Sequence, residues 1–209
     1  AIYKAAYEAG KFGFWIQRQL TALGIDCIVV NPADIPRSQK DTLQKTDPRD
    51  ARNLGLRLQS GVLRGIHIPD EQQEADRVLF RHRKKIWRDL TRCKNRIKGL
   101  LAFSGIAIPE GYDNANWSRN FISWLKQLDC VQPSRRQGLD YMIKQMDFLR
   151  TELLDISNAV RKMMREQRYK TNYYLLRSIP GIGPLTAASL LVEIGDIRRF
   201  ETFYHLNSF

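Results

Sequence analysis

The chain has 209 residues, a net charge of +12 and a pI near 9.8. Its apolar fraction of 43% is enough for the cores of two modest domains, which excludes a disordered or fibrous protein. No apolar run approaches the length of a membrane span, and the excess of basic residues predicts a polyanionic partner, most simply a nucleic acid.

The cysteines are odd in number, widely spaced and without a C-x-x-C pair. This usage is typical of a reduced cytoplasm rather than of a secreted disulfide framework, and no segment resembles a signal peptide. The three histidines are equally scattered, so we expect no zinc site.

Residues 1–66 carry the pattern of an α/β unit. A short apolar stretch at 1–7, helical spacing at 12–23 and a β-branched run at 25–30 predict strand, helix, strand. Two strands cannot cover a helix, so we expect further strands of this sheet upstream of Ala1. A polar loop should follow, and Asp47-Pro48 predicts the start of a helix that runs to about Ser60.

Three acids of this unit could meet at one point. Glu8 ends the first apolar stretch, where active sites of α/β folds commonly lie, and Asp47 and Asp50 share one turn of a helix. Carboxylates are hard ligands suited to Mg²⁺, and paired Mg²⁺ ions support phosphodiester chemistry. Capping explains the same aspartates equally well, since both suit the first turn of a helix, so the residues alone leave both interpretations open.

Two long helices are predicted next, over about 70–104 and 134–167, with a loop and a short amphipathic helix between them. At 1.5 Å per residue each would be about 50 Å long, so we expect the pair to form an antiparallel coiled coil and to seek a partner subunit. The apolar seam of the first is Leu79, Ile86, Leu90, Cys93, Ile97 and Leu100, interrupted by Arg83. That of the second is Leu139, Met142, Met146, Leu149, Leu153, Ile156, Val160 and Met163.

One face of the first long helix is basic. Because acidic residues are nearly absent from this face, the pattern predicts contact with nucleic-acid phosphates. The simpler alternative is a solvated exterior of a coiled coil. Its members are Arg77, Arg81, Lys84, Lys85, Arg88, Arg92 and Arg96.

Residues 178–191 predict two helices joined by a glycine hairpin. Gly181 and Gly183 can both take a positive φ and expose backbone N–H groups, and Pro184 suits the first position of the next helix. Thr186 would add a hydroxyl to the same phosphate. Ile179, Ile182 and Leu185 are expected to pin the hairpin to a small core. The segment is similar to the helix-hairpin-helix motif, and the alternative is a structural Gly-Pro turn.

These motifs, taken together and in order, resemble the DEDD-type insertion-sequence transposases. The resemblance rests on Tyr7-Glu8-Ala9-Gly10, Lys45-Thr46-Asp47-Pro48-Arg49-Asp50-Ala51, Gly61-Val62-Leu63, Pro69, Ile179-Pro180-Gly181-Ile182-Gly183-Pro184 and Glu193-Ile194-Gly195-Asp196. It implies a RuvC-like, ribonuclease-H-related N-terminal domain in which Glu8, Asp47 and Asp50 match the second, third and fourth Mg²⁺-binding acids. It also implies the start of the family's C-terminal transposase domain.

The resemblance implies three domains: a truncated RuvC-like domain at 1–68, a coiled coil at 69–170 and the start of the transposase domain at 171–209. The family's first aspartate would precede Ala1, and its nucleophilic serine would follow Phe209. Ser178, Ser189 and Ser208 do not match that serine's motif. We therefore expect this chain alone not to recombine DNA.

The predicted function is that of an insertion-sequence transposase or recombinase, acting on DNA with Mg²⁺ and assembled as dimers or tetramers through the coiled coil. Guidance by a structured RNA is implied by family analogy alone. One alternative is a Mg²⁺-dependent, RuvC-type structure-selective nuclease. Another is a non-catalytic architectural binder whose acids merely cap a helix.

Overall fold

The computed structural model describes residues 3–35, 47–112, 117–129 and 132–208, so Lys45 and Thr46 of the Lys45–Ala51 motif lie outside the described residues. The chain divides into two compact units, Ala1–Asp70 and Glu71–Phe209, and each is described by itself. Among the helices in the described ranges, none is long and apolar enough to cross a membrane.

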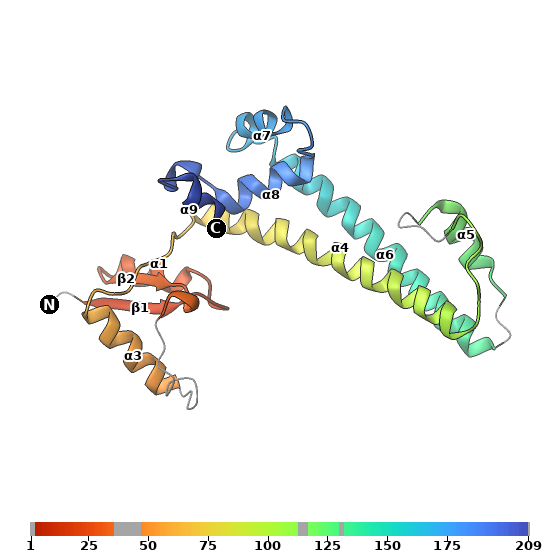
Figure 1. Cartoon of the computed structure of the whole chain (residues 1–209), viewed down its shortest axis with the longest axis horizontal. Coiled ribbons are helices and arrows are strands. Elements are labelled where there is room, and N and C mark those ends of the chain that lie inside the picture. Colours follow the sequence, from red (N-terminus) through yellow and green to blue (C-terminus); the bar gives the residue numbers. More distant parts are fainter. Residues whose placement is uncertain (1–2, 36–46, 113–116, 130–131, 209) are drawn as a thin grey trace. The chain divides into compact units, whose positions relative to one another are not determined.

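The first unit contains the predicted strand-helix-strand. Strands β1 (Lys4–Glu8) and β2 (Asp26–Val30) pair in parallel, with Glu8 opposite Val30, and helix α1 (Trp15–Ala22) connects them (Figure 1). A 3-10 helix (Pro32–Asp34) follows β2. Helix α3 (Asp47–Gln59) begins at the predicted residue and packs against β1.

The return segment after α3 completes the core of this unit. Val29 and Val30 are buried, and the N–H of Ile66 donates to the carbonyl of Val29 at 2.7 Å, so the segment lies along β2. The guanidinium of Arg18 in α1 donates to the carbonyl of Pro69 at 3.0 Å. These bonds tie both the connecting helix and the end of the unit to the sheet.

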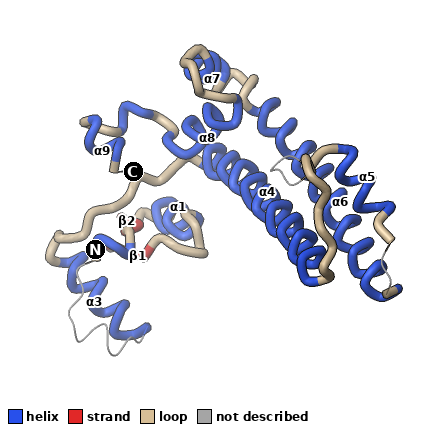
Figure 2. The backbone as a smooth tube through the Cα atoms, turned by 45° about the vertical axis from the view of Figure 1, so that its right-hand side comes forward, coloured by secondary structure: helices blue, strands red, loops and turns tan. Residues whose placement is uncertain are grey.

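The second unit is built on two long helices, α4 (Glu71–Phe103) and α6 (Pro133–Met163), which lie side by side and run in opposite directions (Figure 1). Helix α5 (Arg119–Gln127) lies at one end of the pair (Figure 2). Every predicted seam residue is buried or half-buried. A coiled coil also requires knobs-into-holes packing along the seam, and this stays a prediction.

Helix α6 ends four residues before the predicted position. After Met163 the chain turns, with the N–H of Arg165 donating to the carbonyl of Lys162 at 2.9 Å. This bend brings Met164 and Tyr169 into a buried cluster. Their burial stabilises the bend in place of the last helical turn predicted for α6.

The pair holds two separate apolar clusters. The tip cluster is formed by the buried residues Leu90, Cys93, Ile97, Leu101, Trp117, Phe121, Ile122, Leu125, Leu139, Ile143 and Met146. The base cluster is formed by Phe80, Val160, Met163, Met164, Tyr169, Tyr173, Ala187, Ala188 and Val192. The two clusters include residues of both long helices, and so each fixes one end of the pair.

A polar contact lies between the two clusters. Nε of Arg83 in α4 donates to the hydroxyl of Ser157 in α6 at 3.0 Å, and burial lowers the pKa of Arg83. The predicted interruption of the seam at Arg83 is therefore matched by a polar residue on the facing helix. A shifted register would separate these partners, so the contact favours the observed alignment.

Helices α7 and α8 contribute to the base cluster. Helix α7 (Lys170–Arg177) leads through a hairpin to α8 (Pro184–Ile194), which packs against α4, α6 and α7. A 3-10 helix (Ile197–Arg199) and helix α9 (Phe203–Asn207) complete the unit. The predicted domain boundary near residue 170 falls within this unit and stays a prediction.

The start of α4 holds the end of α8. Gly195 ends α8 with φ +68° and ψ −126°, and a Cβ added there would lie 2.3 Å from Nε2 of Gln73. That amide is buried and donates to the carbonyl of Val192 at 3.1 Å. One turn along, Tyr169 donates to the buried carboxylate of Asp76 at 2.6 Å. These contacts join segments that are far apart in sequence.

Candidate functional site

Glu8 lies where the sequence predicts it, at the carboxyl end of a parallel strand. It is the last residue of β1, it is exposed, and the N–H of Ala9 donates to the carbonyl of Val30 at 2.8 Å. The hydroxyl of Tyr7 donates to the carbonyl of Gly13 at 2.9 Å and holds the loop that follows. The carboxylate is thus presented at the edge of the sheet where α/β folds place their ligands.

The two aspartates lie at the start of α3. Asp47 is the first residue of the helix, but its side chain lies outside the described residues; Asp50 follows one turn later and is half-buried. Because α3 packs against β1, the helix that carries both aspartates touches the strand that ends at Glu8. The convergence of the three carboxylates stays a prediction.

The residue types fit a hard divalent cation. An exposed carboxylate at a strand end and a second one in the first turn of a packed helix supply the oxygen donors that Mg²⁺ takes. Within the described ranges no three acidic, histidine or cysteine side chains are grouped for a metal, and that statement does not cover Asp47.

Six members of the predicted basic face are exposed. Apart from Arg81, which is paired with an acid, we call them the basic strip: Lys84, Lys85, Arg88, Arg92 and Arg96. Arg92 pairs with Asp89 at 3.3 Å, and Arg96 donates to the amide oxygen of Gln145 at 3.1 Å. Both contacts are at the surface, where such pairs contribute little free energy, so these cations are available to a polyanion.

Arg77 does not belong to an exposed face, and that part of the prediction needs correction. Its side chain is 12% exposed, and it donates to the carbonyls of Val192 at 3.1 Å and Glu193 at 2.7 Å. The last carbonyls of a helix lack partners within it and carry partial negative charge, so a cation is stabilised there. Burial lowers the pKa of Arg77.

Arg81 is exposed but paired. Its guanidinium grips both carboxylate oxygens of Glu193, at 2.9 and 2.6 Å, and the hydrogen bonds from Arg81 lower the pKa of that carboxyl. A forked guanidinium suits phosphate as well as carboxylate, so a phosphate would have to compete with Glu193 for these donors of Arg81. Sequence reasoning missed this partner, since it lies 112 residues away.

The two glycines of the hairpin differ in conformation. Gly181 has φ +88° and so uses the freedom that glycine allows. Gly183 has φ −76° and ψ 170° and does not use it; the extended conformation suits the cap position before Pro184, which begins α8 as predicted. A Cβ at Gly183 would meet no atom within 4 Å.

Two of the three apolar residues of the hairpin lie where the sequence predicts them. Ile182 and Leu185 pack against the base cluster as expected, whereas Ile179 is 49% exposed. The N–H of Ile182 donates to the carbonyl of Ile179 at 3.1 Å, and in this turn only one isoleucine faces the cluster. Thr186 is exposed in the first turn of α8. Phosphate binding by the hairpin stays a prediction.

The comparison with protein families matches both regions that carry the resemblance. Residues 5–105 match a family described as "Transposase" (DEDD_Tnp_IS110), and residues 173–209 match one described as "Transposase IS116/IS110/IS902 family". The first match includes most of β1 and the whole of α3 and α4, and the second includes the hairpin and α8. The two occur in the predicted order.

Individual relatives extend this similarity over nearly the whole chain. The chain is 27% identical to the transposase for insertion sequence element IS1533 of Leptospira borgpetersenii, over 97% of its own length and 58% of the relative. It is 25% identical to the transposase for IS1111A of Coxiella burnetii (92% and 51%) and 28% identical to y4qE of Sinorhizobium fredii, named as a candidate transposase (94% and 46%). The chain spans about half the length of these relatives.

Proposed function

Because this chain is related to the insertion-sequence transposases through both of its matched regions, we propose that it contributes the metal-binding acids and nucleic-acid contacts of a DNA transposase. The observation that carries the proposal is the joint occurrence of the two regions, with α3 and its aspartates packed on the strand that ends at Glu8. Strand cleavage and exchange belong to the whole protein and are part of the proposal.

Glu8, Asp47 and Asp50 are the residues that would hold Mg²⁺. When bound, the ion would neutralise charge on the reacting phosphate and act as a Lewis acid. The chain's own contribution is positional: the ladder between β1 and β2 fixes Glu8, and the packing of α3 on β1 fixes the helix start. Carboxylates held on regular elements keep their geometry better than carboxylates on loops.

The basic strip and the hairpin would hold the nucleic acid by its phosphates. The strip supplies long-range charge, whereas the hairpin would supply N–H groups near Gly181 and the hydroxyl of Thr186. By family analogy the partners are DNA and a structured guide RNA. Phosphate contacts of this kind suit either one.

Reversing the charge of Lys84, Arg88 and Arg92 together is expected to flatten the salt dependence of nucleic-acid binding. Each lost phosphate contact lowers the slope of log K against log salt by about 0.9 on duplex DNA, so the slope should fall by roughly 2 to 3. Fluorescence anisotropy titrations between about 50 and 200 mM salt measure it.

A matched control reverses Lys144, Arg150 and Arg119, which lie on α5 and α6 and give the same change in net charge. The control should keep most of the wild-type slope. Equal slopes for the two triple variants would mean that the salt dependence of binding follows net charge alone. The basic strip would then be only a solvated exterior.

Self-association through the long helices is part of the proposal. Phe148 and Leu154 of α6 are 63% and 58% exposed, so an apolar surface of this helix is left uncovered by α4. Phe148→Glu is expected to lower the mass measured by sedimentation while the melting temperature is kept. Ala159→Glu adds the same charge at an exposed position of the same helix, beyond the two apolar side chains, and should leave the mass unchanged. Unchanged mass in both variants would exclude this surface as the contact.

The function is tested with the full-length gene that contains this coding sequence, placed in a transposition reporter with its element ends. Joined strands at a new site support the recombinase. Hydrolysed ends without joining would favour the RuvC-type nuclease, and binding without any cut strand would favour the architectural protein.

A further inference from the structure

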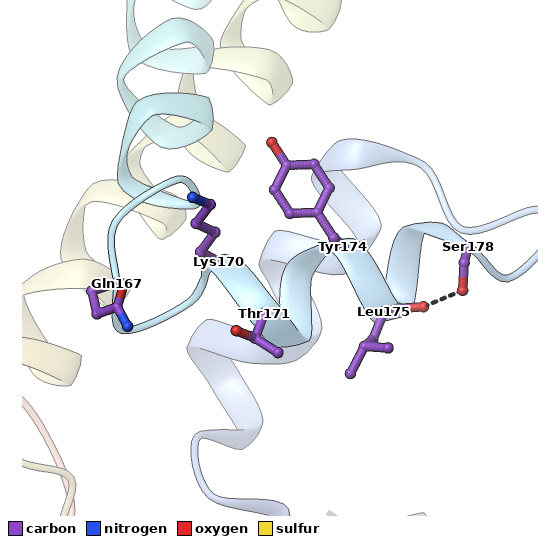
Figure 3. Close-up of a pocket in the computed structure, with 6 residues that line it drawn as sticks. All are labelled: Gln167, Lys170, Thr171, Tyr174, Leu175 and Ser178. Carbon is purple, nitrogen blue, oxygen red and sulfur yellow. Dashed lines mark hydrogen bonds between the residues drawn. The ribbon is translucent and has the colours of Figure 1, made fainter.

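The outer face of α7 carries a shallow hollow of about 510 Å³ (Figure 3). It is lined by residues at positions i, i+3, i+4, i+7, i+8 and i+11, which place them along one side of the helix and its ends. They are Gln167, Lys170, Thr171, Tyr174, Leu175 and Ser178. Four of the six are uncharged and polar, one is basic and none is acidic.

This face is not used by the core. Tyr173 of α7 is 4% exposed and belongs to the base cluster, and Leu176 packs against that cluster. Tyr174 and Leu175, by contrast, are 51% and 62% exposed. The helix is therefore anchored through one side, and its other side presents an aromatic ring and an isobutyl group to solvent.

The surroundings of the hollow are strongly basic. Residues 161–177 contain one acid, Glu166, against the bases Arg161, Lys162, Arg165, Arg168, Lys170 and Arg177. Lys170 and Tyr174 extend from the same side of α7 (Figure 3). A cation beside an exposed ring is complementary to a nucleotide, which joins a phosphate to an aromatic base.

We propose that this face of α7 binds an unpaired nucleotide of an RNA or DNA strand, with the base against Tyr174 and Leu175 and the phosphate near Lys170. Thr171 and Gln167 add polar groups for the sugar and the base edge. An unpaired base is required because the faces of paired bases are covered by their neighbours in a duplex. The inference rests on the proposed function, that the protein holds nucleic acid.

The position of the face supports a strand that continues into the hairpin. Ser178, at the end of the hollow, donates to the carbonyl of Leu175 at 2.8 Å and begins the turn that contains Gly181 (Figure 3). A strand along α7 would therefore reach the exposed backbone of the turn. One strand would then make both the phosphate contacts expected at the turn and the base contact on Tyr174.

The test compares strands that share phosphates and differ in bases. Anisotropy titrations of the 209-residue chain use oligo-dT, oligo-rU and an abasic strand of equal length. The wild type should bind a base-containing strand more tightly than the abasic one. Tyr174→Ala and Tyr174→Leu should each remove at least about fivefold of that difference, and Tyr174→Phe should keep it. Lys170→Ala should lower the salt slope by about 0.7 on single strands.

Tyr141→Ala is the matched control, because Tyr141 is 63% exposed on α6 with the amine of Lys144 5.4 Å from its ring centroid. It should leave the difference between base-containing and abasic strands unchanged. A preference for oligo-rU or for oligo-dT identifies the strand. If wild type and both Tyr174 variants, all with native circular dichroism, show the same difference, the inference fails while the proposed function stands. A wild-type chain that binds no strand or duplex would overturn both.

Discussion

Replacing Glu8 with Gln, or Asp50 with Asn, is expected to reduce transposition by about a hundredfold or more. Loss of a group that merely orients a metal ligand costs about 10- to 100-fold, and a direct ligand should cost at least as much. Both amides keep the shape of the side chain and remove its charge, so the fold should survive. A reporter that counts transposition events in cells carrying the gene measures the effect.

Asp26→Asn is the matched control for these two changes. Asp26 is an exposed carboxylate at the opposite end of the same sheet, at the start of β2, where it pairs with Lys4 at 3.8 Å. Its replacement should leave transposition near the wild-type level. Two results would show that the acids stabilise the helix and do not bind a metal. One is that all three variants keep transposition. The other is that Asp50→Asn lowers only the free energy of unfolding, by about the 0.5–2 kcal/mol that a lost helix cap costs.

Replacing Gly195 with Ala is expected to lower the free energy of unfolding by about 2–4 kcal/mol. The backbone at φ +68° and ψ −126° is strained for any residue with a Cβ, which costs about 1–3 kcal/mol. The new Cβ would also displace the buried amide of Gln73 from the carbonyl of Val192. Loss of this hydrogen bond from the amide costs about 0.5–1.5 kcal/mol, while Arg77 still donates to the same carbonyl. Urea denaturation followed by circular dichroism measures the sum.

Gly105→Ala separates the two causes. Gly105 has the same φ of +68°, but a Cβ there would meet no atom within 4 Å. This control should therefore cost only the backbone strain. The double variant Gln73→Ala with Gly195→Ala should be less destabilised than the sum of the single variants, because the collision is gone. Equal losses for Gly105→Ala and Gly195→Ala would show that the approach to Gln73 contributes nothing.

Local patterns predicted most of the regular elements. Apolar spacing of three and four placed α4 and α6 within a few residues of their observed bounds, because burial of one helix face sets that spacing. The β-branched run before Val30 predicted β2, and Pro184 predicted the start of α8. The acids at Glu8 and Asp50 were found because strand ends and helix starts are themselves visible in the sequence.

Contacts between distant segments were not predictable in this way. The basic spacing of α4 placed Arg77 among exposed cations, yet the ending of α8 draws it inward, since helix carbonyls without partners attract a guanidinium. Gly195 was visible as part of a motif, but nothing local identifies Gln73 as the side chain against it. At Gly183 the neighbouring residue decides the conformation. Glycine can adopt a positive φ, but the cap position before Pro184 requires an extended backbone.

The contact between Arg83 and Ser157 gives the long helical pair a modular construction. The buried apolar contacts on either side of it do not form one continuous core, so a substitution in the tip cluster leaves the packing around α8 untouched. The two ends of the pair can therefore accept sequence change independently. A new tip, suited to a different partner, can evolve on an unaltered base, provided that the polar contact between them keeps the helices in register.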